Sequence, residues 1–368
     1  MDEMPAKDGD RAAPGATTRL RVLATSDLHM TLRGFDHYAD APADGVGLTR
    51  LATLIRAARA EVPEAPTLLV DNGDCLQGTP MDTPALTETR HPLMQAFEAL
   101  GYDAIGLGNH DFNFGLDVLD LVLGDAACPV LCSNARRTDG GPFAAQPGVI
   151  VTRDTGQGPL RIGLLSVLPP QTAMWDAEIL QGRLAVEDMV PAAARSAAAL
   201  RARGADLVIA LAHTGLGEAR AVPGQENALI PLAGLEGIDA LIGGHTHMLL
   251  PDGDGGDAVS GKPVAMPGAG GSHLAVIDLD LARDGDTWRV ARSDSHLRAR
   301  LGVAEDPELL AISDRVHART RRLLTRPIGQ SPWPLHSYFS LVAPSAALAV
   351  VAKAQADAIR ATGQCDLP

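Results

Sequence analysis

Aromatic residues are scarce in this chain: phenylalanine, tryptophan and tyrosine together make up 3% of its 368 residues. Hydrophobic residues as a whole still reach 46% and charged residues 21%, which is typical of a globular protein with a sizeable core. That core must therefore be built mainly from aliphatic side chains. A chain of this length forms one large domain or two smaller ones.

Cysteine is also rare, with only Cys75, Cys128, Cys132 and Cys365. Four cysteines are too few to form a disulfide framework in a chain of this size. The four-residue spacing of Cys128 and Cys132 would suit half of a metal site, but no second cysteine pair faces them. Buried free thiols are therefore the favoured interpretation.

Negative charges outnumber positive ones, and long apolar runs are absent from the sequence. The formal net charge of -14 disfavours a nucleic-acid polymer as partner, because its backbone would be repelled, but a small anion remains possible. No apolar run approaches the roughly 20 residues that span a bilayer, so no membrane partner is expected. Residues 1–19 show no basic start followed by an apolar core, which predicts a disordered leader and no secretory signal. As written, the chain is expected to be cytoplasmic.

What the chain does have is an alternation of short apolar strands and amphipathic helices. Residues 20–324 are predicted to form one main domain and 325–342 a proline-rich linker, after which residues 343–368 begin with a helix that either packs back on that domain or belongs to a chain that is cut short. Helices are predicted at 48–60, 93–100, 116–123, 186–203, 307–324 and 343–361. Strands are predicted at 20–25, 67–70, 104–107, 129–132, 149–151, 160–168, 206–212 and 238–242. Residues 264–266, 274–281 and 288–291 are predicted to form a second, more antiparallel sheet.

Polar, metal-capable side chains follow five of these strands. Burying such groups is unfavourable unless something binds them. Residues two apart on an extended segment point the same way, so each Asp-x-His or His-x-His pair is expected to face one centre. One such cluster can be a surface turn, but five are not expected by chance. The residues are Asp27 and His29, Asp74, Asn109 and His110, His213, and His245 and His247.

The carboxyl ends of parallel strands meet at one edge of a sheet, where α/β proteins place their sites. Imidazole, carboxylate and amide oxygen without thiolate suit Zn, Mn or Fe. Seven ligands are too many for one ion with open positions, and they suit two ions about 3.5–4 Å apart that share a carboxylate. Asp74 is the predicted bridge. His91 is predicted to lie on the surface, and His273 to be structural.

The order of these motifs resembles the calcineurin-like metallophosphoesterase superfamily: Asp-x-His, Gly-Asp, Gly-Asn-His-Asp, a lone histidine after a strand, and Gly-His-Thr-His. Three flanking segments narrow the resemblance, namely residues 71–78 (DNGDCLQG), 108–115 (GNHDFNFG) and 335–340 (LHSYFS). Together they look like the bacterial bifunctional 2',3'-cyclic-nucleotide 2'-phosphodiesterase/3'-nucleotidases of the 5'-nucleotidase group. The similarity runs from about Arg21 to the end of the chain.

The resemblance implies an α/β fold, a four-layer α/β/β/α sandwich of two mixed sheets flanked by helices. It implies His110 as the catalytic histidine beside the phosphate, with Asn109 and His110 binding substrate. In many 5'-nucleotidases an aspartate three positions later pairs with that histidine; here Asn113 stands there, and Asp111 is not expected to replace it. The implied ligands are Asp27, His29, Asp74 and His247 for one metal, and Asp74, Asn109, His213 and His245 for the other.

The function implied by the resemblance is hydrolysis of nucleotide phosphoesters with two divalent ions (Zn, Mn, Fe or Co). A 2',3'-cyclic nucleotide would be opened to a 3'-nucleotide, and then nucleoside and phosphate would be released. Two alternatives stay open. One is a related hydrolase of 5'-nucleotides, nucleotide sugars or sulfur esters. The other is a metal-loaded but non-catalytic nucleotide binder, because the resemblance implies that residues 20–324 are the catalytic domain and 343–368 only the start of a truncated C-terminal nucleotide-binding domain. The sequence does not indicate an oligomeric state, and members of the family are often periplasmic.

Overall fold

The computed structural model describes residues 17–141, 143–252, 258–285 and 287–363. The chain divides into two compact units, Met1–Arg321 and Arg322–Pro368. Across the described residues, none of the helices combines the length and the apolar character needed to cross a bilayer.

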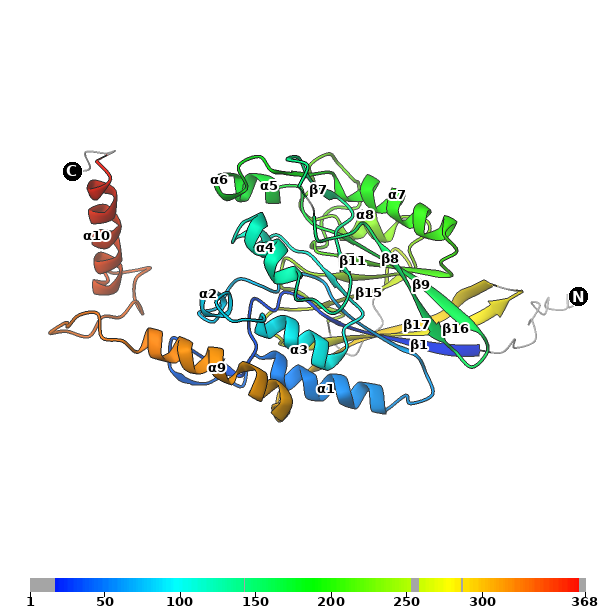
Figure 1. Ribbon diagram of the computed structural model, residues 1–368, viewed down its shortest axis with the longest axis horizontal. Helices are drawn as coiled ribbons and strands as arrows, with labels where there is room; N and C mark the ends of the chain where they lie inside the picture. Colours follow the sequence, from blue (N-terminus) through cyan, green and yellow to red (C-terminus); the bar gives the residue numbers. More distant parts are fainter. Residues whose placement is uncertain (1–16, 142, 253–257, 286, 364–368) are drawn as a thin grey trace, which may run out of the picture. The chain divides into compact units, whose positions relative to one another are not determined.

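The first unit contains two β-sheets packed face to face between layers of helices (Figure 1). Helices α1 and α3 cover the outer face of the sheet that contains β1, and α7 and α8 cover the outer face of the sheet that contains β11 (Figure 1). The expected four-layer α/β/β/α sandwich is confirmed.

The first sheet has six strands in the order β17-β16-β1-β4-β5-β6. Strands β1, β4, β5 and β6 run parallel to their neighbours, whereas β16 is antiparallel to β1 and β17 to β16. The strands are β1 (Thr17–Thr25), β4 (Thr67–Asp71), β5 (Ala104–Gly106), β6 (Val130–Leu131), β16 (His273–Asp284) and β17 (Thr287–Ala299).

The second sheet has the order β13-β15-β12-β11-β9-β8, with β14 paired to β15. Strands β9, β11, β12 and β15 are parallel, so both sheets present a parallel centre. The strands are β8 (Val149–Asp154), β9 (Pro159–Val167), β11 (Leu207–Ala212), β12 (Ala240–Gly243), β13 (Leu249–Leu250), β14 (Ala258–Val259) and β15 (Lys262–Pro267).

Helices and short strands complete the unit. The small strand pairs are β2 (Phe35–Asp36) with β3 (Ala41–Pro42) and β7 (Ala135–Arg137) with β10 (Leu184–Val186). The helices are α1 (Leu48–Ala60), α2 (Asp82–Ala85), α3 (Pro92–Leu100), the 3₁₀ helix η1 (His110–Phe112), α4 (Leu116–Leu123), α5 (Thr172–Trp175), α6 (Ala177–Leu180), α7 (Met189–Ala202), α8 (Leu229–Ala233) and α9 (Pro307–Leu324).

Three hydrophobic clusters fill the spaces between the layers. Val22 of β1 and Ile209 of β11 belong to the middle cluster, between the sheets. The next residue along β1, Leu23, joins the cluster under α1 and α3, and Val208 of β11 joins the cluster under α7. Successive side chains on a strand point to opposite faces, so both sheets are buried on both sides. This explains why their parallel strands are apolar throughout.

Most predicted helices are confirmed, and α1, α3, α4 and α9 lie within one residue of their expected limits. Helix α7 begins at Met189, later than predicted, because Val186 still pairs with Ala135 in the β7–β10 ladder. In the second unit, α10 (Ala346–Ala361) starts after the predicted Ala343. Pro344 disfavours a helical residue before it, and Ser345 caps the helix by accepting a hydrogen bond from the backbone N–H of Leu348 at 3.4 Å.

The prediction that residues 264–266, 274–281 and 288–291 form a separate antiparallel sheet is wrong. Strand β15 pairs in parallel with β12, while β16 and β17 extend the first sheet beyond β1. The physical reason lies in β16, where Val276 and Ile277 belong to different hydrophobic clusters. A strand buried on both faces needs the cover that only the existing sandwich supplies.

Three smaller expectations change as well. Strand β1 includes Thr17–Arg19 at the end of the predicted leader, because Thr17 pairs with Ala282; residues 1–16 lie outside the described residues. His91 is not on the surface: the residue is 3% exposed, and it lines a small cavity together with Leu86, Leu121 and Val122. Cys75 and Cys132 are buried free thiols and Cys128 is partly buried, whereas Cys365 lies outside the described residues.

Candidate metal centre

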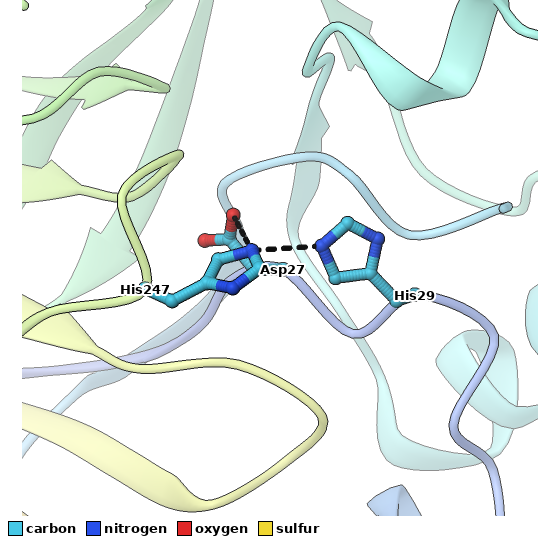
Figure 2. Close-up of side chains that lie close together, drawn as sticks. All are labelled: Asp27, His29 and His247. Carbon is cyan, nitrogen blue, oxygen red and sulfur yellow. Dashed lines mark hydrogen bonds and ion pairs between the residues drawn. The ribbon is translucent and has the colours of Figure 1, made fainter. Parts of the chain in front are cut away.

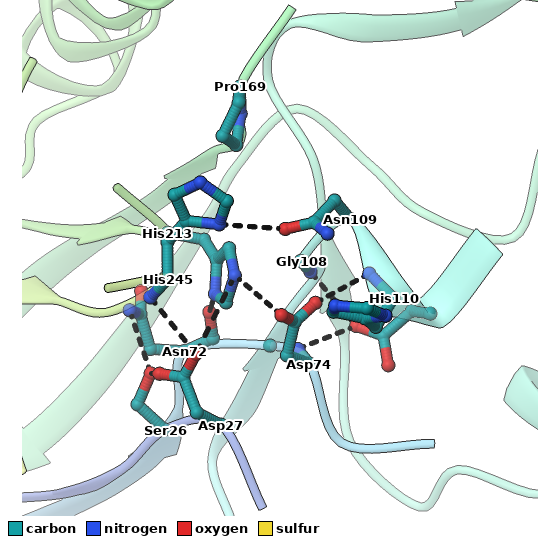
Figure 3. A network of polar contacts seen from close by, with 12 residues as sticks. Ser26, Asp27, Asn72, Asp74, Gly108, Asn109, His110, Pro169, His213 and His245 are labelled. Carbon is teal, nitrogen blue, oxygen red and sulfur yellow. Dashed lines mark hydrogen bonds and ion pairs between the residues drawn. The ribbon is translucent and has the colours of Figure 1, made fainter. Parts of the chain in front are cut away.

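The carboxyl ends of β1, β4 and β5 in one sheet and of β11 and β12 in the other meet at one edge of the sandwich (Figure 3). Each strand is parallel to its neighbour in this set, so all five polar segments project from the same edge. The two sheets are joined there directly, because the backbone N–H of His245 donates to Asp27 Oδ1 at 3.0 Å. The predicted convergence of residues far apart in sequence is confirmed.

Asp27, His29 and His247 form one group of possible metal ligands, and one ligand atom from each lies within 4.8 Å of the others (Figure 2). His247 Nε2 is 3.0 Å from His29 Nε2 and 3.5 Å from Asp27 Oδ1. Ligands held at about 2.0–2.2 Å around one tetrahedral ion are separated by similar distances. Asp27 is fully buried, whereas the side chain of His247 is 49% exposed.

A second group consists of Asp74, His213 and His245. His213 Nε2 lies 3.0 Å from Asp74 Oδ2, and His245 Nδ1 lies 2.9 Å from Asn109 Oδ1 (Figure 3). The two groups are adjacent, since His213 Nε2 is 3.9 Å from Asp27 Oδ1. Asp74 falls within the second group, and its role as a bridge stays a prediction.

The backbone at these residues is not extended. Asp27, His29, Asp74, His245 and His247 all have φ between 47° and 67°, a left-handed conformation that costs a non-glycine residue about 1–3 kcal/mol and is concentrated at functional sites. The expectation that residues two apart would face one centre through strand geometry is therefore wrong for His245 and His247. They lie in different groups, because each peptide turns sharply after its strand ends.

Close backbone packing holds Asp74 in place. A Cβ atom on Gly108 would lie 2.2 Å from Asp74 Oδ1, and one on Gly73 would lie 2.2 Å from the backbone nitrogen of Gly108. Only glycine allows the loops after β4 and β5 to approach this closely. The backbone N–H of His110 donates to Asp74 Oδ1 at 2.7 Å, which fixes the carboxylate.

Hydrogen bonds assign the ring nitrogens of three histidines. His29 Nδ1 lies 2.8 Å from the carbonyl oxygen of Gln77, His213 Nδ1 lies 3.0 Å from that of Asn72, and His245 Nε2 lies 2.8 Å from Glu226 Oε1. Carbonyl and carboxylate oxygens only accept, so these nitrogens carry the hydrogen. The opposite nitrogen of each ring faces another proposed ligand, on His247, Asp74 and Asn109 respectively, which is the orientation found in metal-binding histidines.

The carboxylates of Asp27 and Asp74 make this buried site favourable for a positive charge. Burial lowers the pKa of His213, but the carboxylates of Asp74 and Asp27 outweigh it and raise the pKa to about 10. Burial likewise opposes ionisation of Asp74, yet His213 holds the pKa of Asp74 below its usual range. Asp74 Oδ2 and His213 Nε2 are buried, and within the described residues neither makes a hydrogen bond of normal geometry. Buried polar atoms without such a partner are expected where a ligand binds. The donor set of imidazoles, carboxylates and an amide oxygen suits Zn, Mn, Fe or Co.

His110 lies beside this centre, its ring centroid 5.2 Å from that of His29. His110 Nδ1 is 2.7 Å from Asn113 Oδ1, so the structure brings together the two residues predicted to be catalytic. Asp111 is turned away: its carboxylate accepts four backbone N–H groups, from Asp74, Cys75, Leu76 and Gly108.

Sequence reasoning missed three residues at the site. Glu226 accepts from His245, Trp175 stacks on the His245 ring at a centroid distance of 5.7 Å, and Asp176 accepts from Asn113. None of them follows a strand, and they lie in or near short elements without clear periodicity. No local signal marks them, apart from the adjacent aromatic and acidic residues at 175 and 176.

Comparisons with known proteins agree with this geometry. A family model described as calcineurin-like phosphoesterase matches residues 20–249. The chain is 34% identical to the trifunctional nucleotide phosphoesterase protein YfkN of Bacillus subtilis over 94% of this chain and 25% of that protein. It is also 34% identical to the 2',3'-cyclic-nucleotide 2'-phosphodiesterase/3'-nucleotidase of Salmonella typhimurium, over 92% of this chain and 56% of that protein.

Thus the chain spans only about a quarter to a half of the length of these curated relatives. Among solved structures, that of the calcineurin-like phosphoesterase YfkN from Bacillus subtilis superposes with a TM-score of 0.79 and 34% identity, covering 84% of this chain and all of the other. A 5'-nucleotidase structure from Staphylococcus aureus shares the fold, with a TM-score of 0.71 and 21% identity over 89% of this chain and 64% of that one. The chain belongs to the calcineurin-like phosphoesterase family.

Proposed function

We propose that this chain is the catalytic part of a dinuclear-metal phosphoesterase that acts on nucleotides. The proposed reactions are opening of 2',3'-cyclic nucleotides to 3'-nucleotides and release of nucleoside and phosphate from those. The observation that carries the proposal is the pair of adjacent ligand groups, Asp27–His29–His247 and Asp74–His213–His245. The substrate class is supported by the names of the relatives, which are nucleotide phosphoesterases.

The residues proposed to hold one ion are Asp27, His29, Asp74 and His247, and those proposed for the other are Asp74, Asn109, His213 and His245. When bound, two such ions supply Lewis acidity toward water and toward the phosphoryl oxygens. Two divalent ions bring four positive charges, and Asp27 and Asp74 return two negative ones. The net charge of plus two would make the site locally positive within an acidic protein and therefore suited to a phosphate group.

His110 and Asn109 are the residues proposed to contact the substrate. Hydrolysis of the cyclic diester forms a bond from phosphorus to a water oxygen and breaks the bond to the 2'-oxygen, which takes up a proton. His110 Nδ1 is held by Asn113, so His110 Nε2 is the nitrogen proposed to face the phosphate, and it donates to the leaving oxygen when the imidazole is protonated on both nitrogens. The Asn109 amide would donate to the phosphate through its nitrogen, while its oxygen faces His245.

Substitution of Asp74 tests the proposal. Asp74→Asn removes a buried negative charge and should abolish turnover of 2',3'-cyclic AMP, with loss of at least one bound metal per chain by elemental analysis. Glu64→Gln, which changes an exposed carboxylate, is the matched control and should retain both properties. Full activity and full metal content in Asp74→Asn would contradict the two-metal assignment.

Two alternatives are distinguished by the same protein. A panel of 2',3'-cyclic, 3'- and 5'-nucleotides and nucleotide sugars, assayed at one metal concentration, separates the proposed activity from that of a related hydrolase. A chain that binds stoichiometric metal and nucleotide but hydrolyses no ester would be a binding protein instead.

A further inference from the structure

His110, Asn113 and Asp176 form a chain of contacts that begins at His110 Nδ1. His110 Nδ1 lies 2.7 Å from Asn113 Oδ1. The amide nitrogen of Asn113 lies 2.9 Å and 3.0 Å from the two carboxylate oxygens of Asp176. Asp176 lies 63 residues from Asn113 in sequence, so only the tertiary fold brings the three together.

The amide of Asn113 has two unlike ends, and this makes its orientation matter. Its oxygen accepts hydrogen bonds and its nitrogen donates them. Turned one way, Asn113 would accept from His110 Nδ1; turned the other way, it would offer a donor to the same nitrogen. The two orientations require different tautomers of neutral His110. If Nδ1 carries the hydrogen, the substrate-facing Nε2 is an acceptor; if Nδ1 accepts from Asn113, Nε2 carries the hydrogen and is a donor.

Asp176 removes the ambiguity. Ionised carboxylate oxygens only accept, and both oxygens of Asp176 lie against the same nitrogen of Asn113. The amide oxygen must therefore face His110, and His110 Nδ1 must carry a hydrogen. This leaves His110 Nε2 as the nitrogen available to the substrate.

The position of Asp176 indicates that its carboxylate serves the contact with Asn113 and not the capping of a helix. Asp176 is the N-cap residue of α6, where an aspartate ordinarily accepts a hydrogen bond from a backbone N–H of the first turn. Its side chain makes no capping hydrogen bond. Its backbone carbonyl oxygen accepts hydrogen bonds from the N–H groups of Ile179 at 3.0 Å and Leu180 at 2.8 Å.

We propose that Asp176 is a positioning residue, which orients the amide of Asn113 and thereby sets the tautomer of His110. The consequence for turnover rests on the proposed function, whereas the tautomer itself does not. A carboxylate at position 113 would need no such partner, because its two oxygens are equivalent and either can accept from His110. The need for Asp176 is therefore specific to an amide at this position.

A double-mutant cycle between positions 113 and 176 tests the proposal. Asp176→Ala alone should lower kcat about tenfold, the order of magnitude for loss of a residue that orients a catalytic group, with little change in KM. In the Asn113→Asp background, the same Asp176→Ala change should cost nothing or should raise kcat. There a carboxylate already accepts from His110, and removing Asp176 relieves repulsion between two neighbouring carboxylates. Glu178→Gln, an exposed carboxylate of the same helix, is the matched control.

An equal loss of kcat in both backgrounds would overturn the proposal, since it would mean that Asp176 only supports the fold. Thermal unfolding of each variant checks folding. If Asp176→Ala lowers the melting temperature, Asp176→Ser replaces it, because serine is among the residues most favoured at a helix N-cap and alanine is not.

A second measurement needs no catalysis. Long-range ¹H–¹⁵N correlation spectra of metal-free protein, with the His110 signals assigned from His110→Gln, should show the Nδ1–H form in the parent chain and loss of that preference in Asp176→Ala. An Nε2–H form in the parent chain would overturn the proposal. If no ester is hydrolysed but the tautomer shifts as expected, the proposed function fails while the positioning role stands.

Discussion

At the scale of single residues, Asp111 is a buried carboxylate that links two loops of the site. It is fully buried and accepts four backbone N–H groups at 2.9–3.0 Å, from Asp74, Cys75, Leu76 and Gly108. Burial raises the pKa of Asp111, and the hydrogen bonds from Gly108, Leu76 and Cys75 oppose that rise. Its carboxylate thus holds the loop after β4 against the loop after β5, and it is a support for the ligands instead of a reacting group.

We expect Asp111→Asn to destabilise the protein by roughly 2–4 kcal/mol, because an amide offers only one acceptor oxygen and turns a donor toward other N–H groups. Urea unfolding measures the change. The control is Asp36→Asn, which affects an exposed turn where the carboxylate accepts from the N–H groups of Tyr38 and Ala39, and should cost less than about 1 kcal/mol. A similar, small loss in both variants would contradict the assigned role.

Because His91 is buried, the stability of the protein should depend on pH independently of the candidate metal centre. Burial lowers the pKa of His91 from 6.5 to about 4. Between these values the unfolded chain binds a proton that the folded chain does not, so stability falls as pH decreases from about 6.5 toward 4. The loss attributable to His91 is at most roughly 3 kcal/mol. His91→Leu should remove this part of the pH dependence in urea unfolding at pH 7 and pH 5, and an unchanged slope would disprove it.

At the scale of secondary-structure elements, the pairing of β1 with β16 contains a buried ion pair. Arg21 lies directly opposite Asp278 in the ladder, and its guanidinium donates to both carboxylate oxygens at 2.7 Å. Arg21 also donates to Glu61 at 2.9 Å and to the carbonyl oxygen of Ala58 at 3.0 Å. One strand is thereby tied both to its neighbour and to the end of α1.

Replacing only one residue of the Arg21–Asp278 pair should destabilise the protein more than replacing both residues. Arg21→Met leaves Asp278 buried without its partner and should destabilise the protein by about 3–5 kcal/mol. Adding Asp278→Leu should recover most of that loss, because two apolar side chains suit a buried ladder position. The cycle is read by urea unfolding at pH 7, and additive effects of the two changes would contradict the assignment.

At the scale of the whole molecule, the candidate metal centre joins the two sheets of the sandwich. Asp27, His29, Asp74 and Asn109 lie in loops that follow strands of the first sheet, and His213, His245 and His247 lie in loops that follow strands of the second. Ions held by both sets would bind the folded protein and not the unfolded chain. Metal binding should therefore stabilise the sandwich as a unit.

Removal of metal by a chelator should lower the melting temperature by about 5 °C or more, because a ligand present at 100 times its Kd contributes about 2.7 kcal/mol. Re-addition of Zn or Mn should restore the melting temperature in the parent chain, with a smaller response in Asp74→Asn. Identical melting curves with and without chelator would show that the residues hold no ion.

Helix limits were predicted more accurately from the sequence than the pairing partners of strands. Helices α1 and α9 were predicted to their exact limits, and the prediction for α1 rested on apolar positions repeated at helical spacing. The assignment of β15, β16 and β17 to one separate sheet failed, since pairing partners are not encoded in the local pattern of a strand. The backbone at Asp27 and His29 was also misjudged, because left-handed turns at non-glycine residues leave no sequence signal.

The sequence by itself determined the fold class, through the resemblance of its motifs to a known family, and the set of residues that converge at the strand ends, since five strands end in polar, metal-capable side chains. Only the tertiary structure decided which of those side chains share a centre: His245 and His247 are two apart in sequence but belong to different groups. It also brought Asp176 to Asn113 and Glu226 to His245. Such contacts depend on how two sheets and their loops pack together, and that packing is set by burial across the whole chain and not by any local pattern.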